Sequence, residues 1–243
     1  YNTAYGSRSL NANVTSSSNT AVGYNSLLVN TAASNTAVGK DSLESNTTGG
    51  SNVAIGADAL ANNTTASNNT AVGKDALTAN TTANANVAVG KRALASNTTG
   101  SNNVALGTDA LENHTTGSDN IAIGKNVANA LTTGNTNVAI GGQAMNTNTV
   151  GDRNVAIGYS ALETYNPSSN EDSYNVAVGF AALEANTTAK NNTAIGGNAL
   201  LVNTTGSSNV AVGIGTLDAC TTGGSNIAVG ALAGMVWNYT MSR

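Results

Sequence analysis

The sequence predicts an all-β fold, a parallel β-solenoid of about fourteen coils with 17 residues in each coil. Three observations lead to this prediction. The string Asn-(Thr/Val/Ile)-Ala-apolar-Gly occurs fourteen times in the 243 residues, and its side chains alternate between two faces. A turn-forming string, Asn-Thr-Thr-(Gly/Ala), closes most of the copies.

The repeat period is nearly constant. Eleven of the thirteen intervals between the glycines of the string are 17 residues, one is 16 and one is 21. The longest interval carries its extra residues within 164–174, which holds the only proline, Pro167, and the phase resumes afterwards. We therefore expect residues 1–234 to form a single repetitive β-roll with one loop near 164–174. The pattern breaks after residue 234, so residues 235–243 are predicted to form a cap or a junction.

The composition excludes several classes of protein. The chain has 39 Asn and 33 Thr, whereas charged residues are 9% and Cys and His occur once each. One Cys and one His cannot supply a disulfide framework or a zinc site, and they leave little for acid–base catalysis. No apolar run approaches 18 residues, and the net charge of −4 gives no basic field for nucleic acid. We expect no catalytic, cofactor-binding or metal residue, no nucleic-acid partner and no membrane insertion by this segment.

Positions within a copy are counted from the glycine that ends the string. Position −2 is Ala in all fourteen copies, position −1 is Val, Ile or Leu in thirteen, and position +4 is Leu in eleven. The alternation predicts a strand of about five residues. A second strand-like piece is expected at the Ala-Leu step of positions +3 and +4, followed by the Asn-Thr-Thr-Gly turn. Helix is disfavoured because Gly, Asn and Thr, which have weak helix propensity, recur throughout.

Position −4 is Asn in every copy. Stacked coils place this residue above its equivalent, so the side-chain amides are predicted to bond from coil to coil as a structural ladder. The fourteen residues are Asn2, Asn19, Asn35, Asn52, Asn69, Asn86, Asn103, Asn120, Asn137, Asn154, Asn175, Asn192, Asn209 and Asn226.

The alternation also assigns residues to faces. We expect the apolar residues at −1 and +4 to form a thin core of two or three side chains per coil. The Ala at −2 would then lie on the opposite face and form a second closely packed surface. Lateral self-association, most simply of three chains around one axis, would account for that surface.

Charged residues occupy a few positions of the repeat. Lysines at +1 are Lys40, Lys74, Lys91 and Lys125, and aspartates at +2 are Asp41, Asp58, Asp75 and Asp109. This stripe of mixed sign favours solubility and limits non-specific association, and a receptor-binding stripe is the alternative. Calcium fits less well, because the glycine–aspartate nonapeptide of calcium-binding β-rolls is absent.

His114 and Cys220 replace the turn Asn in two copies. With no second His or Cys position beside it, His114 is predicted to be a tolerated surface substitution. A single thiol could crosslink chains, although a neutral substitution is the favoured interpretation of Cys220.

Six copies carry an Asn-Thr-Thr sequon on a predicted exposed turn, so glycosylation is one interpretation of these residues. Turn chemistry explains them equally without any sugar. They are Asn46, Asn63, Asn80, Asn97, Asn186 and Asn203.

Several copies also resemble known repeats. The strings Ser51–Gly56 and Asn154–Gly158 resemble the Asn-Ser-Val-Ala-Ile-Gly repeat of YadA-like trimeric autotransporter adhesin heads. Longer strings such as Asn69–Leu77 are similar to repeats in tail-fibre proteins of phages and bacteria. The resemblance covers residues 2 to about 234, although the adhesin repeat is shorter than the one here. It implies a left-handed β-roll and an intertwined or side-by-side homotrimer with adhesin or fibre function.

We therefore expect a non-enzymatic structural or adhesive fibre segment, extracellular on a cell surface or a virion, that forms a stiff rod for attachment or filament building. Its expected partners are copies of itself, as a homotrimer that could also assemble end to end, and a host receptor or glycan. A solute- or ice-binding β-solenoid that uses Thr and Asn arrays is the alternative. A carbohydrate-degrading solenoid would need clustered carboxylates in a groove, whereas here they are spread along the rod.

Overall fold

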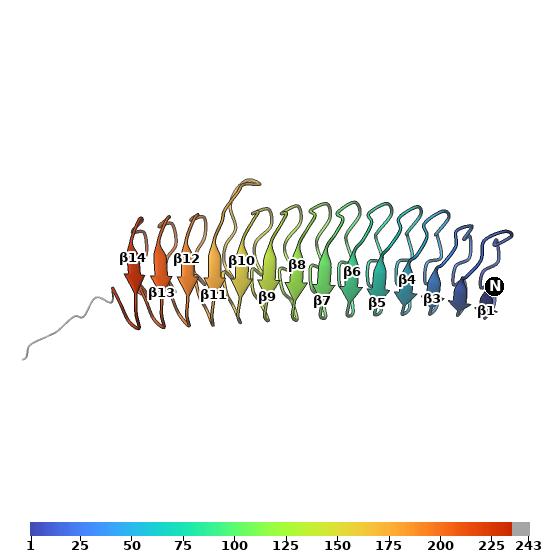
Figure 1. Cartoon of the computed structure of the whole chain (residues 1–243), viewed down its shortest axis with the longest axis horizontal. Helices are drawn as coiled ribbons and strands as arrows, with labels where there is room; N and C mark the ends of the chain where they lie inside the picture. The colour runs from blue at the N-terminus through green and yellow to red at the C-terminus, as the bar shows by residue number, and fades with distance from the viewer. Residues whose placement is uncertain (235–243) are drawn as a thin grey trace, which may run out of the picture.

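A computed structural model describes residues 1–234, and it shows a β-solenoid whose coils stack along one axis (Figure 1). Fourteen parallel strands of three residues follow one another in chain order as a single sheet, which confirms the predicted fold class. Within these residues no helix is present that could cross a membrane. The predicted cap or junction at 235–243 lies outside the described residues. The strands are β1 (Thr3–Tyr5), β2 (Thr20–Val22), β3 (Thr36–Val38), β4 (Val53–Ile55), β5 (Thr70–Val72), β6 (Val87–Val89), β7 (Val104–Leu106), β8 (Ile121–Ile123), β9 (Val138–Ile140), β10 (Val155–Ile157), β11 (Val176–Val178), β12 (Thr193–Ile195), β13 (Val210–Val212) and β14 (Ile227–Val229).

The strands pair with equivalent residues opposite one another. In the pairing of β6 with β7, for example, Ala88 lies opposite Ala105. Backbone hydrogen bonds also join the turns of adjacent coils, as where Leu94 N donates to Ala110 O at 3.0 Å. Hydrogen bonds thus connect each coil to its neighbours at several points around its circumference.

Each coil contains one strand and not two. The Ala-Leu step at +3 and +4 lies in a turn, and the residues at +2 and +4 adopt left-handed conformations, such as Asp75 with φ 59° and Leu77 with φ 51°. The predicted second strand-like piece is therefore wrong, and the first is shorter than expected. Asp and Asn tolerate this conformation better than most residues, which gives a backbone reason for their frequency at +2.

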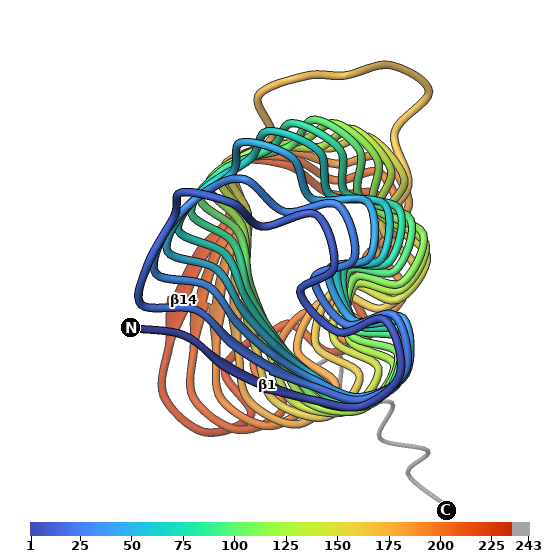
Figure 2. The ribbon, with the colours of Figure 1, turned by 90° about the vertical axis from the view of Figure 1, so that its right-hand side faces the viewer.

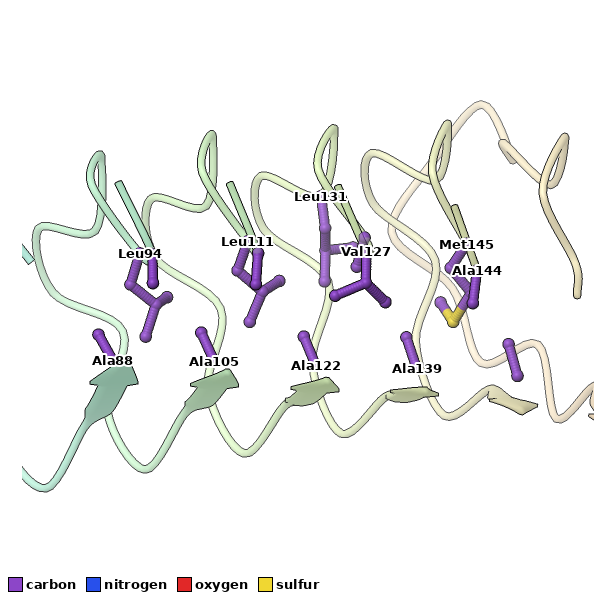
Figure 3. Close-up of a cluster of buried hydrophobic side chains, with 14 of the residues drawn as sticks. Ala88, Leu94, Ala105, Leu111, Ala122, Val127, Leu131, Ala139, Ala144 and Met145 are labelled. Atoms are coloured by element: carbon purple, nitrogen blue, oxygen red, sulfur yellow. The ribbon is translucent and has the colours of Figure 1, made fainter. Parts of the chain in front are cut away.

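The core lies between the strands and the turn opposite them (Figure 3). The side chains of Ala88 and Ala105 point from the strands toward Leu94 and Leu111, and all four are fully buried. The prediction that the Leu at +4 enters the core is confirmed. The prediction that the Ala at −2 faces away from it is wrong, because the narrow coil leaves room for only a small residue opposite each Leu.

The residues at −1 point out of the coil. Ile55, Ile157 and Ile195 are 40%, 36% and 41% exposed, so the prediction that position −1 supplies the core is also wrong. The residues at −3 share this outer face, since they alternate with the buried Ala. The sheet therefore presents Val, Ile, Leu and Thr on its outside.

One loop interrupts the regular outline. A loop within residues 164–174, between β10 and β11, projects from the stack (Figure 2). Tyr165 anchors the start of the loop, because its ring is fully buried and its hydroxyl lies 2.5 Å from Ser173 Oγ. Lys190 pairs with Glu171 at 2.6 Å and Arg153 pairs with Asp172 at the end of the loop.

Candidate functional site

The Asn residues at −4 form a ladder inside the coil. From Asn19 onward, the backbone N–H of each Asn donates to the Oδ1 of its equivalent in the preceding coil, as from Asn69 to Asn52 at 3.0 Å. In most coils Nδ2 also donates to a carbonyl fourteen residues later, as from Asn52 to Ala66 O at 2.8 Å, whereas Asn154 Nδ2 donates to Asp152 O and to Asn137 Oδ1. The link between coils therefore uses the backbone as donor, while direct amide-to-amide bonds occur in only some pairs, such as Asn120 to Asn103 at 3.1 Å.

A second ladder occupies position +7, the turn Asn. Asn63 Nδ2 donates to Asn46 Oδ1 at 2.8 Å and to Ala66 O at 3.0 Å, so both ladders converge on the same carbonyl. These side chains are fully buried. Because buried polar groups need partners, each Asn satisfies groups that the turn would otherwise leave unpaired.

The six sequon residues belong to this second ladder. The prediction that they lie exposed on a turn is wrong, since all six are fully buried and each Nδ2 donates inside the coil. A glycan on Nδ2 would remove one of its hydrogens and would have no space in this fold. The residues are Asn46, Asn63, Asn80, Asn97, Asn186 and Asn203.

His114 also lies in the second ladder, so the prediction of a surface substitution is wrong. Its side chain is fully buried, and Nε2 lies 2.8 Å from Gly117 O, which requires the neutral ring to carry its hydrogen on Nε2. Within the described residues, Nδ1 of His114 and Oδ1 of Asn97 in the preceding coil have no partner. Burial lowers the pKa of His114 below its ordinary value, and the hydrogen bond to Gly117 only partly opposes this.

The chain is expected to lose stability on acidification through His114. Because the pKa is lower in the folded chain, the unfolded chain binds the proton more readily, and the free energy of unfolding falls as the pH drops below about 6.5. His114→Asn should abolish this part of the pH dependence and restore a ladder bond of about 1 kcal/mol. Urea unfolding of both proteins between pH 5 and 8 measures the difference. Identical pH dependence in the two would contradict the assignment.

Other replacements in the second ladder also indicate its burial. Leu131 and Tyr165 stand where most coils have Asn, and both are fully buried. The sequence alone therefore contains a signal that position +7 is buried, because this otherwise polar position accepts an apolar residue and a large aromatic residue. Cys220 occupies the same position and is partly buried, with Sγ 3.6 Å from Gly223 O.

The stripe of charges lies on the surface and is partly self-paired. Lys74 contacts Asp75 at 2.8 Å, and Arg92 bridges Asp109 at 2.9 Å and Glu112 at 2.8 Å in the next coil. These pairs raise the pKa of Lys74 and of Arg92, with the hydrogen bond to the carboxylate as the main cause. Exposed pairs of this kind add little stability. Across residues 1–234, no group of three or more His, Cys, Asp and Glu residues could hold a metal ion.

The threonines of the turn form two columns that differ in their bonding. At +8 the hydroxyl is already committed, as where Thr98 Oγ1 donates to Thr115 O at 3.0 Å. Most threonines at +9, such as Thr82 and Thr99, are exposed. An array for binding ordered water would therefore have one row of free hydroxyls and not two.

The outer face of the sheet is a continuous surface without charged residues. Within β1–β14 every residue at −3 and −1 is half-buried or exposed, and those at −1 are all Val, Ile or Leu after Tyr5. Because successive strands are in register, these side chains form two parallel rows along the solenoid.

Comparisons of the chain with models of protein families, with curated proteins and with solved structures found no match.

Proposed function

We propose that the chain is a non-enzymatic segment of an extracellular fibre, in which three copies associate through the outer face of their sheets. The observation that carries this proposal is the exposed aliphatic face. Soluble single chains seldom expose apolar patches larger than a few hundred Å². Fourteen strands at about 4.8 Å per step extend roughly 60 Å, and three residues span about 10 Å, so the face covers on the order of 600 Å².

That area suits a stable association between chains. A standard interface takes about 800 Å² from each partner, which is the same order of magnitude. The row at −1 is Val, Ile or Leu after Tyr5, and the row at −3 combines Val and Ile with Thr in five strands, so desolvation of the uncharged face would be favourable mainly through the −1 row. The resemblance to trimeric adhesin heads supports three as the number of chains, and it supports attachment as the purpose of the rod.

The mechanism would be mechanical. Hydrogen bonds within the sheet, between the turns and along both Asn ladders connect successive coils, so bending the rod would strain many bonds together. A rod of this kind holds a binding element at a fixed distance from the surface that carries it. The charged stripe would keep neighbouring fibres apart.

Small-angle X-ray scattering of the intact chain tests the proposed rod. We expect an elongated particle whose cross-section is clearly wider than that of one solenoid, because three coils lie side by side. A cross-section equal to that of a single solenoid would contradict association through the sheet face.

A further inference from the structure

An aromatic pair breaks the pattern of the charged stripe. Tyr159 and Phe180 occupy position +1 in adjacent coils, where other coils carry Lys40, Lys74 or Lys91. Their rings are stacked, with centroids 6.0 Å apart and planes 10° from parallel. The two side chains are 53% and 60% exposed, so the stack stands in solvent and contributes little to the core.

Glycines leave space on both sides of the stack. Position +1 is Gly142 in the preceding coil and Gly197 in the following coil. A Cβ added at Gly142 would lie 3.5 Å from Tyr159 Cδ2 and 3.6 Å from Cε2, so this glycine leaves one side of the Tyr159 ring uncovered. A Cβ added at Gly197 would meet only Ile214 Cγ1, at 3.9 Å, so the space beside Phe180 is also open.

Positions +1 and +2 around the stack are uncharged and include two amides, while the two coils of the stack carry Glu163 and Glu184 at +5. In the five coils that begin at Gly142, Tyr159, Phe180, Gly197 and Ile214, positions +1 and +2 carry no charged residue. Gln143 and Asn198 flank the pair at +2, and Tyr159 Oη donates to Gln143 Oε1 at 3.1 Å. The amides of Gln143 and Asn198, which can hydrogen-bond to a neutral ligand, therefore lie beside the exposed rings.

We propose that the Tyr159–Phe180 pair is a subsite for a neutral oligosaccharide. The face of an aromatic ring carries partial negative charge, and the axial C–H groups of an equatorially substituted pyranose carry partial positive charge. Such a sugar can lie flat on the uncovered ring while its hydroxyls bond to the amides of Gln143 and Asn198. An anionic ligand has no cationic partner at +1 or +2 here, and the carboxylates of Glu163 and Glu184 at +5 of the same coils would repel it. This inference rests on the proposed attachment function, for which it names the ligand class.

Saturation-transfer-difference NMR with chitotetraose and with cellotetraose tests the subsite on the intact chain. We expect transfer to the axial C–H protons of at least one of them. The double variant Tyr159→Leu/Phe180→Leu should weaken binding at least tenfold, and Gly142→Ala, which covers one ring with a methyl group, should weaken it less. Tyr24→Leu is the matched control, because Tyr24 is a solitary exposed ring at the same position, and it should leave binding unchanged.

Several outcomes would overturn the subsite. No transfer to either sugar would do so, as would binding that survives the double variant. Light scattering on the same samples separates this inference from the proposed fibre. A wild-type trimer that binds neither sugar contradicts the subsite alone, and a single chain that binds sugar contradicts the trimer alone. Dissociation of the double variant would show that the rings are a contact between subunits and would also overturn the subsite.

Discussion

Replacing Gly90 by Ala is expected to destabilise the solenoid by about 3 kcal/mol or more, because the substitution combines a steric clash with backbone strain. An added Cβ would lie 2.4 Å from Gly107 O and 2.5 Å from Gly107 C in the next coil. The φ of Gly90 is +139°, well outside the left-handed region that Asp and Leu occupy elsewhere in the coil. The backbone of the next coil has no room to move, since it makes the same contact with the coil after it.

Urea unfolding followed by circular dichroism measures this effect. Gly142→Ala is the matched control, because Gly142 has no such φ and its added Cβ would make only ordinary contacts. We expect the control to change the free energy of unfolding by less than about 0.5 kcal/mol. Equal stabilities of the two variants would contradict the account of the glycine position.

Three lysines on the outer sheet face are expected to convert the proposed trimer into single chains. Val89→Lys, Ile123→Lys and Ile157→Lys place one charge on every second coil of the face. Burying an unpaired ammonium group costs several kcal/mol, so three per chain exceed what the face can gain on association. The fold itself should persist, because these side chains do not enter the core. Sedimentation velocity reports the change in mass, and circular dichroism reports the fold.

The matched control carries the same charges on another side of the coil. Thr48→Lys, Thr82→Lys and Thr116→Lys replace exposed threonines at +9, also in every second coil. This variant should remain trimeric. A sheet-face variant that sediments like the control would place the subunit contact elsewhere on the molecule.

The repeat period predicts most of the fold. No other residue fits the position of a glycine such as Gly90, so a constant spacing between these glycines indicates that they stack above one another in successive coils. Which face of the strand is inside could not be predicted from the alternation. Val and Ile are expected inside by their hydrophobicity, yet the narrow coil admits only Ala88 and its equivalents opposite Leu94. The distance across the coil depends on the left-handed turn at residues such as Asp75 and Leu77, and Leu rarely adopts that conformation.

For the two Asn ladders, too, the sequence predicts one property and not another. An Asn in every copy at −4 predicts a structural role. The hydrogen bond from Asn52 closes a coil and the hydrogen bond from Asn69 joins two coils, as such a role requires. The burial of the turn Asn could not be predicted from its own string, because Asn-Thr-Thr-Gly is also typical of an exposed turn. The surface position expected for His114 is wrong for the same reason, although Leu131 at the same position of the repeat indicates burial.

Association of three chains through the sheet face is tested by the molar mass of the intact chain in solution. One chain has a mass of 24.0 kDa, so three chains predict 3 × 24.0 = 72.0 kDa by size-exclusion chromatography with multi-angle light scattering. We expect that value across a tenfold range of protein concentration. A mass of 24.0 kDa throughout would contradict it, since the aliphatic face of the sheet would then remain in water.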